Sequence, residues 1–231
     1  MDRKKIKKIL QNNPKMAHMI CTIYNHFPFN NKFKLSKNNE LKNDGILNDC
    51  IVKVKGSGNR IHIGSLARLN NTVITIKGNN NQVFIGKGCL IVDGELYIED
   101  DGGSIEIGDS TEICGKTHLA VIEGKKITIG QGCLFSSSIV VRTGDSHSIL
   151  DKSGNRINPS QSVYIGDHVW IGNQVTVLKG SEINRDCIVG TGALVTKKIN
   201  CTNVIIAGNP AKIIKENIYW CGERIAMKED K

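Results

Sequence analysis

The stretch VYIGDHVWIGNQVTVLKGSEINRDCIVGTGALVTKKI, residues 163–199, carries an aliphatic residue at every sixth position. A period of six fits neither the 3.6-residue turn of a helix nor the alternation of a hairpin meander. It is typical of short β segments turned at regular intervals, in which three hexads close one 18-residue coil. The aliphatic series is Ile165, Ile171, Val177, Ile183, Val189 and Val195. A second series, small or β-branched, falls four positions later at Val169, Val175, Ser181, Cys187, Ala193 and Ile199.

The same phrase occurs earlier in the chain at a longer spacing. Its copies are IHIGSLARL (61–69), VFIGKGCLI (83–91), IEIGDSTEI (105–113) and ITIGQGCLF (127–135), each 22 residues after the one before. We interpret 22 as a coil of 18 plus a surplus of four. The surplus is expected in the turn-rich segments 55–59, 77–81, 99–103 and 123–126, where glycine and asparagine tolerate positive φ.

Composition agrees with an all-β solenoid capped at both ends. Only 5% of the 231 residues are aromatic and 24 are glycine, which favours many short strands and turns. We expect an N-terminal helical cap over 1–40, with a helix in 1–28 broken near Pro14. One face of it would carry Ile6, Ile9 and Leu10, another Met16, Met19, Ile20 and Tyr24. The β-helix is expected over 41–208 and a helical tail over 209–231, beginning in AKIIKENIYW (211–220).

The charge and the cysteines exclude several classes of protein. The net charge of +9 permits an anionic partner, but no nucleic-acid module is present and aromatic residues for base stacking are scarce. No secretory signal and no apolar run of ~18 residues is found, so we expect a cytoplasmic protein without a transmembrane segment. The eight cysteines form no CxxC pair. Cys89, Cys133 and Cys187 each follow a repeat isoleucine by four residues and should be core residues.

Residues 163–199, followed by AGNPAKIIKE (207–216), resemble the hexapeptide-repeat acyltransferases, above all the bacterial O-acetyltransferases that modify capsule and other surface polysaccharides. The resemblance spans about residues 60–215. It implies a left-handed parallel β-helix, a homotrimer with acetyl-CoA bound between subunits, and transfer of acetyl to a saccharide hydroxyl. Acetylation of a nucleotide amino sugar or of serine, and a non-catalytic scaffold, remain alternatives. The γ-type carbonic anhydrases share the coil, but they use HxxxxH zinc ligands that this chain lacks, so no metal is expected.

The regular spacing of the repeat is interrupted between Ile129 and Ile165, which are 36 residues apart. Residues 144–162 do not keep the period and are mostly polar, so we expect a loop that leaves the wall of the coil. Acyl transfer to a hydroxyl needs a base near neutral pH, which suits histidine. The resemblance assigns that role to His147 in DSHS. Asp145 would share a face with His147 in an extended segment and could orient the imidazole.

The remaining site residues follow from the resemblance. It places Trp170 beside the acceptor and the thioester. It places Asn173, Thr191, Thr196 and Lys197 along acetyl-CoA, and it places Lys212 and Lys215 near the nucleotide phosphates. Two lysines keep the charge but lose the bidentate grip of the arginines common in relatives. We expect His168, in an outward hexad position, to be a surface residue.

Overall fold

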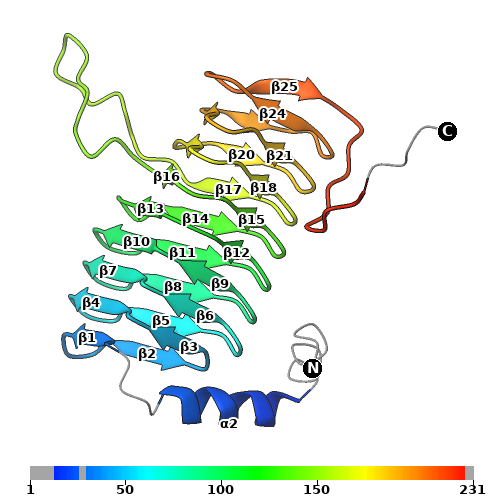
Figure 1. The fold of residues 1–231 in the computed structure, drawn as a ribbon. Helices are drawn as coiled ribbons and strands as arrows, with labels where there is room; N and C mark the ends of the chain where they lie inside the picture. Colours follow the sequence, from blue (N-terminus) through cyan, green and yellow to red (C-terminus); the bar gives the residue numbers. More distant parts are fainter. Residues whose placement is uncertain (1–12, 26–29, 227–231) are drawn as a thin grey trace.

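The computed structural model describes residues 13–25 and 30–226, and it folds into a parallel β-helix with three sheets (Figure 1). Each coil contributes one strand to each sheet, and the strand stacks on its counterpart in the previous coil. Every residue of the first six-residue series is 0% exposed, and those of the second series are 0–5% exposed. The prediction of an all-β, hexapeptide-coil solenoid is therefore confirmed.

The sheets are named A, B and C in the order in which the chain enters them. Sheet A contains β1 (Lys32–Leu35), β4 (Ile51–Lys55), β7 (Val73–Lys77), β10 (Gly94–Glu99), β13 (Thr117–Val121), β16 (Ile139–Arg142), β19 (Thr176–Val177) and β22 (Leu194–Val195). Sheet B contains β2 (Glu40–Asn43), β5 (Arg60–Ile63), β8 (Gln82–Ile85), β11 (Ser104–Ile107), β14 (Lys126–Ile129), β17 (Val163–Ile165), β20 (Glu182–Ile183) and β23 (Lys198–Ile199). Sheet C contains β3 (Ile46–Asn48), β6 (Arg68–Asn70), β9 (Leu90–Val92), β12 (Glu112–Ile113), β15 (Leu134–Phe135), β18 (Trp170–Ile171), β21 (Ile188–Val189), β24 (Ile205–Ala207) and β25 (Lys212–Lys215).

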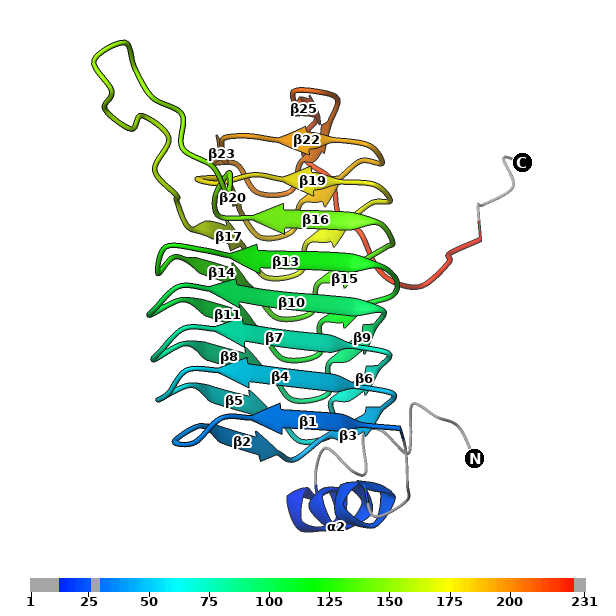
Figure 2. The same cartoon turned by 90° about the vertical axis from the view of Figure 1, so that its left-hand side faces the viewer.

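The register follows the sequence repeat. Ile63, Ile85, Ile107 and Ile129 are successive partners in sheet B, one coil apart. Ile129 then pairs directly with Ile165, although 36 residues separate them. These 36 residues therefore form one coil with a long insertion, not two coils. Figure 2 shows the insertion, residues 144–162, projecting from the wall between β16 and β17.

The three sheets form the faces of a prism. The predicted surplus of four residues lies at one of its corners, where the chain passes from sheet A to sheet B. The turns 56–59, 78–81, 100–103 and 122–125 stack there, and the long loop leaves from the same corner. Gly56 has φ +107°, and a Cβ on it would lie 2.0 Å from the carbonyl oxygen of Gly78, so only glycine fits. Beneath, the side chain of buried Asn59 accepts a bond from Asn81 N at 2.9 Å. We call this edge the A–B corner.

Three cysteines belong to the core, as predicted. Cys89, Cys133 and Cys187 are 0–2% exposed. Burial raises the pKa of the Cys89 and Cys133 thiols to about 11, so both are neutral and unreactive near pH 7.

The N-terminal cap is a single described helix, α2 (Pro14–Asn25), which lies beside β3. Proline suits its first position because that N–H has no helical partner. Ala17 and Cys21 are buried, whereas Met19 is 55% exposed and Ile20 is 37% exposed. Of the apolar face predicted at Met16, Met19, Ile20 and Tyr24, Met19 and Ile20 are therefore exposed, and the small residues Ala17 and Cys21 are the ones that are covered. Ile6, Ile9 and Leu10 lie outside the described residues. The coils begin at Lys32, earlier than the predicted residue 41.

The predicted C-terminal helix is wrong. Residues 212–215 form β25, which runs antiparallel to β24, because the last coil leaves an open strand edge whose backbone groups need partners. Lys212 lies opposite Ala207, and Lys215 lies opposite Ile205, because a bulge inserts one residue between them. Since cross-strand partners share a face, the two lysines still project on the same side. Among the described residues no helix is long and apolar enough to span a membrane.

Candidate active site

The loop 144–162 is an ordered excursion from the A–B corner. Its two arms meet through an antiparallel bridge between Leu150 and Arg156, and Ile157 N donates to Ile149 O at 2.9 Å. At its tip, the carboxylate of Asp151 accepts bonds from Ser153 N and Asn155 N at 2.8 and 2.9 Å. The loop therefore holds side chains in defined positions outside the wall.

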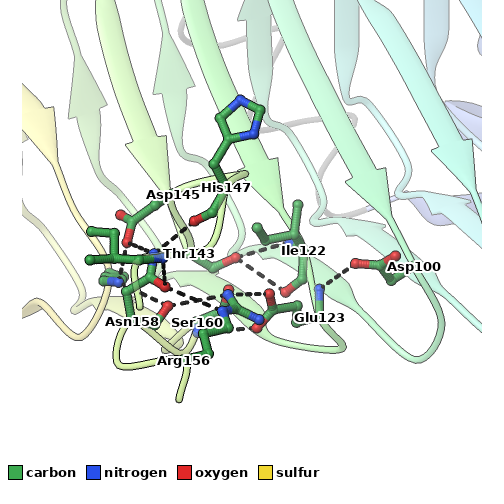
Figure 3. Close-up of polar contacts among 11 residues, drawn as sticks. Asp100, Ile122, Glu123, Thr143, Asp145, His147, Arg156, Asn158 and Ser160 are labelled. Atoms are coloured by element: carbon green, nitrogen blue, oxygen red, sulfur yellow. Dashed lines mark hydrogen bonds and ion pairs between the residues drawn. The ribbon is translucent and has the colours of Figure 1, made fainter. Parts of the chain in front are cut away.

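His147 lies near the root of this loop, on the outgoing arm, and is exposed. Its backbone oxygen accepts a bond from the Asn158 side chain at 2.8 Å. Figure 3 shows the imidazole pointing away from the polar cluster that holds the backbone. In the described part of the chain, no side chain hydrogen-bonds to the ring, so both ring nitrogens can serve a substrate.

Asn158, on the returning arm, ties the loop together and is only 6% exposed. Its Nδ2 donates to both Asp145 Oδ2 and His147 O, each at 2.8 Å. Its Oδ1 accepts from Ile149 N at 2.8 Å and from Arg156 Nε at 3.2 Å. One buried amide thus fixes the backbone on both sides of His147.

Asp145 does not share a face with His147, and that prediction is wrong. Ser146 between them has φ +64°, so the segment is not extended. The Asp145 carboxylate pairs instead with Lys179, which lies on the next coil, and accepts from Asn158. Lys179 and Asn158 hold the pKa of Asp145 below its usual range, so the carboxylate is ionised at neutral pH.

A second ion pair ties the returning arm to the preceding coil. Arg156 lies 2.6 Å from Glu123, whose carboxylate also accepts from Ser160 N at 3.2 Å. The Arg156 guanidinium lowers the pKa of Glu123. The loop is therefore anchored to the preceding coil through Glu123 (Figure 3), and to the next coil through Lys179. Sequence reasoning missed Glu123, Arg156, Asn158 and Lys179. The available signal was the position of Lys179, two residues after the core residue Val177, at the corner from which the loop leaves.

The residues predicted along the donor divide between two edges of the prism. Val195 stacks on Val177, which stacks on Val141, so Thr196 and Lys197 lie exposed at the A–B corner above the root of the loop. The other residues lie on sheet C or at the corner where sheet C passes to sheet A. There Asn173 O accepts from Gly192 N at 2.8 Å, and Asn173 Oδ1 accepts from Ser137 N at 2.9 Å. Thr191 stands exposed beside Gly192.

Trp170 lies on the outer face of sheet C and is 38% exposed. The tail brings a second tryptophan against it, which sequence reasoning did not single out. Trp220 is centred 6.0 Å from Trp170, and it stacks on His168 at 4.1 Å with an interplanar angle of 6°. Trp220 Nε1 donates to His168 O at 2.9 Å, and the His168 ring also contacts Asp186. His168 is thus a partly covered surface residue that supports the tail.

The predicted site is therefore assembled in two halves. One half, at the A–B corner, holds His147, Asp145, Thr196 and Lys197. The other, on sheet C and its far corner, holds Trp170, Asn173, Thr191, Lys212 and Lys215. Within the described residues, no hydrogen bond or ion pair joins the halves. No group of three or more histidine, cysteine, aspartate or glutamate residues there is arranged to hold a metal ion.

Comparison with known proteins gives consistent matches. Residues 162–197 match the bacterial transferase hexapeptide (six repeats) family. The chain is 35% identical over 120 residues to the polysialic acid O-acetyltransferase of Escherichia coli O1:K1 / APEC, covering 52% of this chain and 38% of that protein. It is 35% identical over 118 residues to the polysialic acid O-acetyltransferase of Neisseria meningitidis, covering 51% and 54%. The matched segments thus span about half, or less, of these relatives. The solved structure of the polysialic acid O-acetyltransferase OatWY superposes with a TM-score of 0.75 at 30% identity, covering 86% of this chain and 94% of that one.

Proposed function

The chain belongs to the bacterial hexapeptide-repeat transferase family, and we propose that it transfers the acetyl group of acetyl-CoA to a hydroxyl of a surface polysaccharide or related saccharide. The observation that carries the proposal is the His147 imidazole, exposed and unbonded on a loop that polar contacts fix to a rigid wall. The names of the similar relatives, which are O-acetyltransferases, support the choice of a hydroxyl acceptor.

In this proposal His147 is the general base. A ring nitrogen takes the hydroxyl proton while the acceptor oxygen bonds to the thioester carbonyl carbon. The carbon–sulfur bond then breaks, and the imidazolium returns the proton to the departing thiolate. Transfer is direct in this proposal. The thiols of Cys89 and Cys133 are buried and neutral, so neither of these two supplies a nucleophile.

Asp145 acts as a positioning residue in this scheme. Its carboxylate is bonded to Lys179 and Asn158, and Asn158 in turn holds the backbone of His147. Asp145 therefore helps to fix the backbone from which the imidazole projects, and it does not bond to the ring.

The two halves of the site support a shared active site between copies of the chain. His147 and Trp170 lie on different edges of one prism, so one copy cannot place both at one thioester. Packing the A–B corner of one subunit against sheet C of the next would unite them, and cyclic symmetry would repeat the contact. We propose a homotrimer of this kind, acting in the cytoplasm where acetyl-CoA is made.

The donor would then lie between the halves. Lys212 and Lys215 share a face of β25 and are exposed, so they would meet the nucleotide phosphates. Asn173 and Thr191 would line the pantetheine arm, where Gly192 keeps the backbone open. Thr196 and Lys197 would approach from the neighbouring subunit.

One experiment tests the base and the shared site together. His147→Ala and Trp170→Ala are made separately, and acetyl-CoA consumption is measured with a panel of saccharides. We expect His147→Ala to lose ~10²–10⁴-fold in kcat with its fold retained. In a co-expressed mixture of the two inactive variants, about a quarter of the interfaces would carry both native residues, so activity should return to that fraction.

Two results would count against this proposal. A loss below tenfold in His147→Ala would remove His147 as the base. Failure of the mixture to regain activity, while each variant still assembles, would remove the shared site. An amino-sugar acceptor preferred over every hydroxyl acceptor would favour the alternative of N-acetylation, and no turnover with any acceptor would favour a scaffold.

A further inference from the structure

The strands that the first coils contribute to sheet A carry a group of positive charges. Strands β1, β4 and β7 contain five lysines and no acidic residue. The lysines are Lys32, Lys34, Lys53, Lys55 and Lys77, all exposed. In β4 they alternate with Val52 and Val54, which are buried, so Lys53 and Lys55 point outward.

Four of these lysines have no compensating charge within the part of the chain that the structure describes. Lys77 is engaged by Tyr97 at 2.8 Å and by Glu99 at 3.9 Å. The other acidic residue of β10, Glu95, is bonded to His118 at 2.9 Å. Lys32, Lys34, Lys53 and Lys55, which we name the lysine ladder, form no ion pair with any residue in 13–25 or 30–226.

The ladder is arranged at a cost to the fold. Lys34 is the direct cross-strand partner of Lys53, and Lys55 is that of Lys77. Like charges opposite each other on neighbouring strands are destabilising, because the strands are only ~4.8 Å apart. An anionic ligand lying across these strands would remove that repulsion.

The ladder and the candidate base belong to the same sheet. The loop that carries His147 leaves from β16, five strands above β1 in sheet A (Figure 2). At ~4.8 Å per strand, this separation is about 24 Å. One sugar at His147 therefore cannot touch the ladder, whereas an extended polymer can reach both.

We propose that the lysine ladder is a second binding surface for the acceptor, and that this acceptor is a polyanionic saccharide chain. The proposal rests on the proposed function for the identity of the reaction, and it adds the class of substrate. Acidic groups along the chain would pair with the ladder while a distant sugar meets His147. The outward positions of β1, β4 and β7 offer no aromatic side chain for base stacking, so a saccharide fits better than a nucleic acid. Phe33 of β1 is 51% exposed, but it is the cross-strand partner of the buried Val52, so it lies on the core side of the strand and not beside Lys32 and Lys34.

The test compares two triple variants that each remove three positive charges. The ladder variant is Lys34→Gln, Lys53→Gln and Lys55→Gln. The control variant is Arg68→Gln, Lys87→Gln and Arg185→Gln, which lie on sheet C or at the corner where sheet B passes to sheet C. Binding of long, labelled polysialic acid is measured without acetyl-CoA, with dextran as the neutral chain. At low salt we expect the ladder variant to bind on the order of tenfold more weakly and the control to bind like the parent, with a smaller difference at ~0.15 M salt.

Kinetics and stability complete the test. The ladder variant should lose kcat/KM for the polymer and keep it for a sialic acid disaccharide, while its Tm stays equal or rises. The proposal would be overturned if both variants lost affinity for polysialic acid equally. It would also be overturned if the parent bound dextran as tightly as polysialic acid. Tighter, ladder-dependent binding of single-stranded DNA or of anionic vesicles would assign the surface to another partner. The binding measurement needs no turnover, so its outcome is separate from failure of the transferase proposal.

Discussion

The wall of the β-helix and the loop 144–162 are held in place by different interactions. In the wall, one aliphatic side chain per hexad is buried against the next coil, and single positions such as Ile165 and Ile183 are 0% exposed. In the loop, Ile149, Leu150 and Ile157 are more than half exposed. Its shape depends instead on a buried amide, Asn158, and on two ion pairs to neighbouring coils.

The difference separates stability from chemistry. Apolar burial is non-directional and repeats from coil to coil, so the wall is stiff and tolerant of its exact outward residues. Hydrogen bonds are directional, so the loop fixes a single geometry around His147 but contributes little to the stability of the whole. Mutations in the wall should therefore show their effect in folding and thermal stability, whereas mutations in the loop should show it in kcat.

The largest effect is expected in the wall. Ile183→Asp would place a carboxylate among Ile165 and Ile199, its partners in sheet B, without any counter-charge. We expect loss of the folded protein, seen as insoluble expression or absence of a cooperative thermal transition. The control is Phe84→Asp, which points outward from the same sheet and is 42% exposed, and it should fold. A normal melting temperature for Ile183→Asp would break the assigned register.

The wall could be predicted from the sequence because its cause is periodic. The 22-residue spacing of Ile63, Ile85, Ile107 and Ile129 gave the stacking register, and it placed the surplus turns. The loop could be located only as an interruption of the same pattern. Its internal contacts follow no period, and the left-handed backbone at Ser146 redirects Asp145 away from His147. The C-terminal strand was missed because residues 212–215 suit helix or strand alike, and only the open edge of β24 decides between them.

A smaller but specific effect is expected from Asn158→Ala in the loop. The change removes the donor to Asp145 and to His147 O, and the acceptor for Ile149 N. We expect kcat to fall about 10–100-fold, because the imidazole loses its position, while KM for acetyl-CoA is unchanged. Steady-state kinetics at saturating donor would measure this split.

The matched control for that variant lies in the same loop. Asn155→Ala removes only the bond that the Asn155 side chain donates to Asp151 Oδ2 at the exposed tip, so its kcat should match the parent. A second variant, Asn158→Asp, keeps the acceptor but sets a carboxylate beside Asp145, and it should be at least as impaired as Asn158→Ala. If Asn158→Ala lowered Tm strongly and left kcat intact, Asn158 would stabilise the fold without positioning the imidazole.

The smallest effect is expected for the ion pair between Lys179 and Asp145. Asp145 is depressed in pKa by Lys179 first and Asn158 second. A carboxylate with a lowered folded pKa stabilises the fold above its unfolded pKa, about 3.9, and this contribution is lost as pH falls through the folded pKa. Lys179→Met should therefore lower Tm between about pH 5 and 7, and the difference should shrink as the pH falls below the unfolded pKa and through the lowered folded pKa. Because Asp145 is 40% exposed, the difference should be only about 1–3 °C. Thermal melts of the parent and variant across this range would measure it.

Lys198→Met, which breaks the exposed pair with Glu182 outside the loop, is the control for loss of one surface charge. Its kcat should be unchanged, whereas that of Lys179→Met should fall a few-fold. A pH-independent Tm difference would show that Lys179 acts by packing alone, and the loop would then be less electrostatic than its contacts indicate.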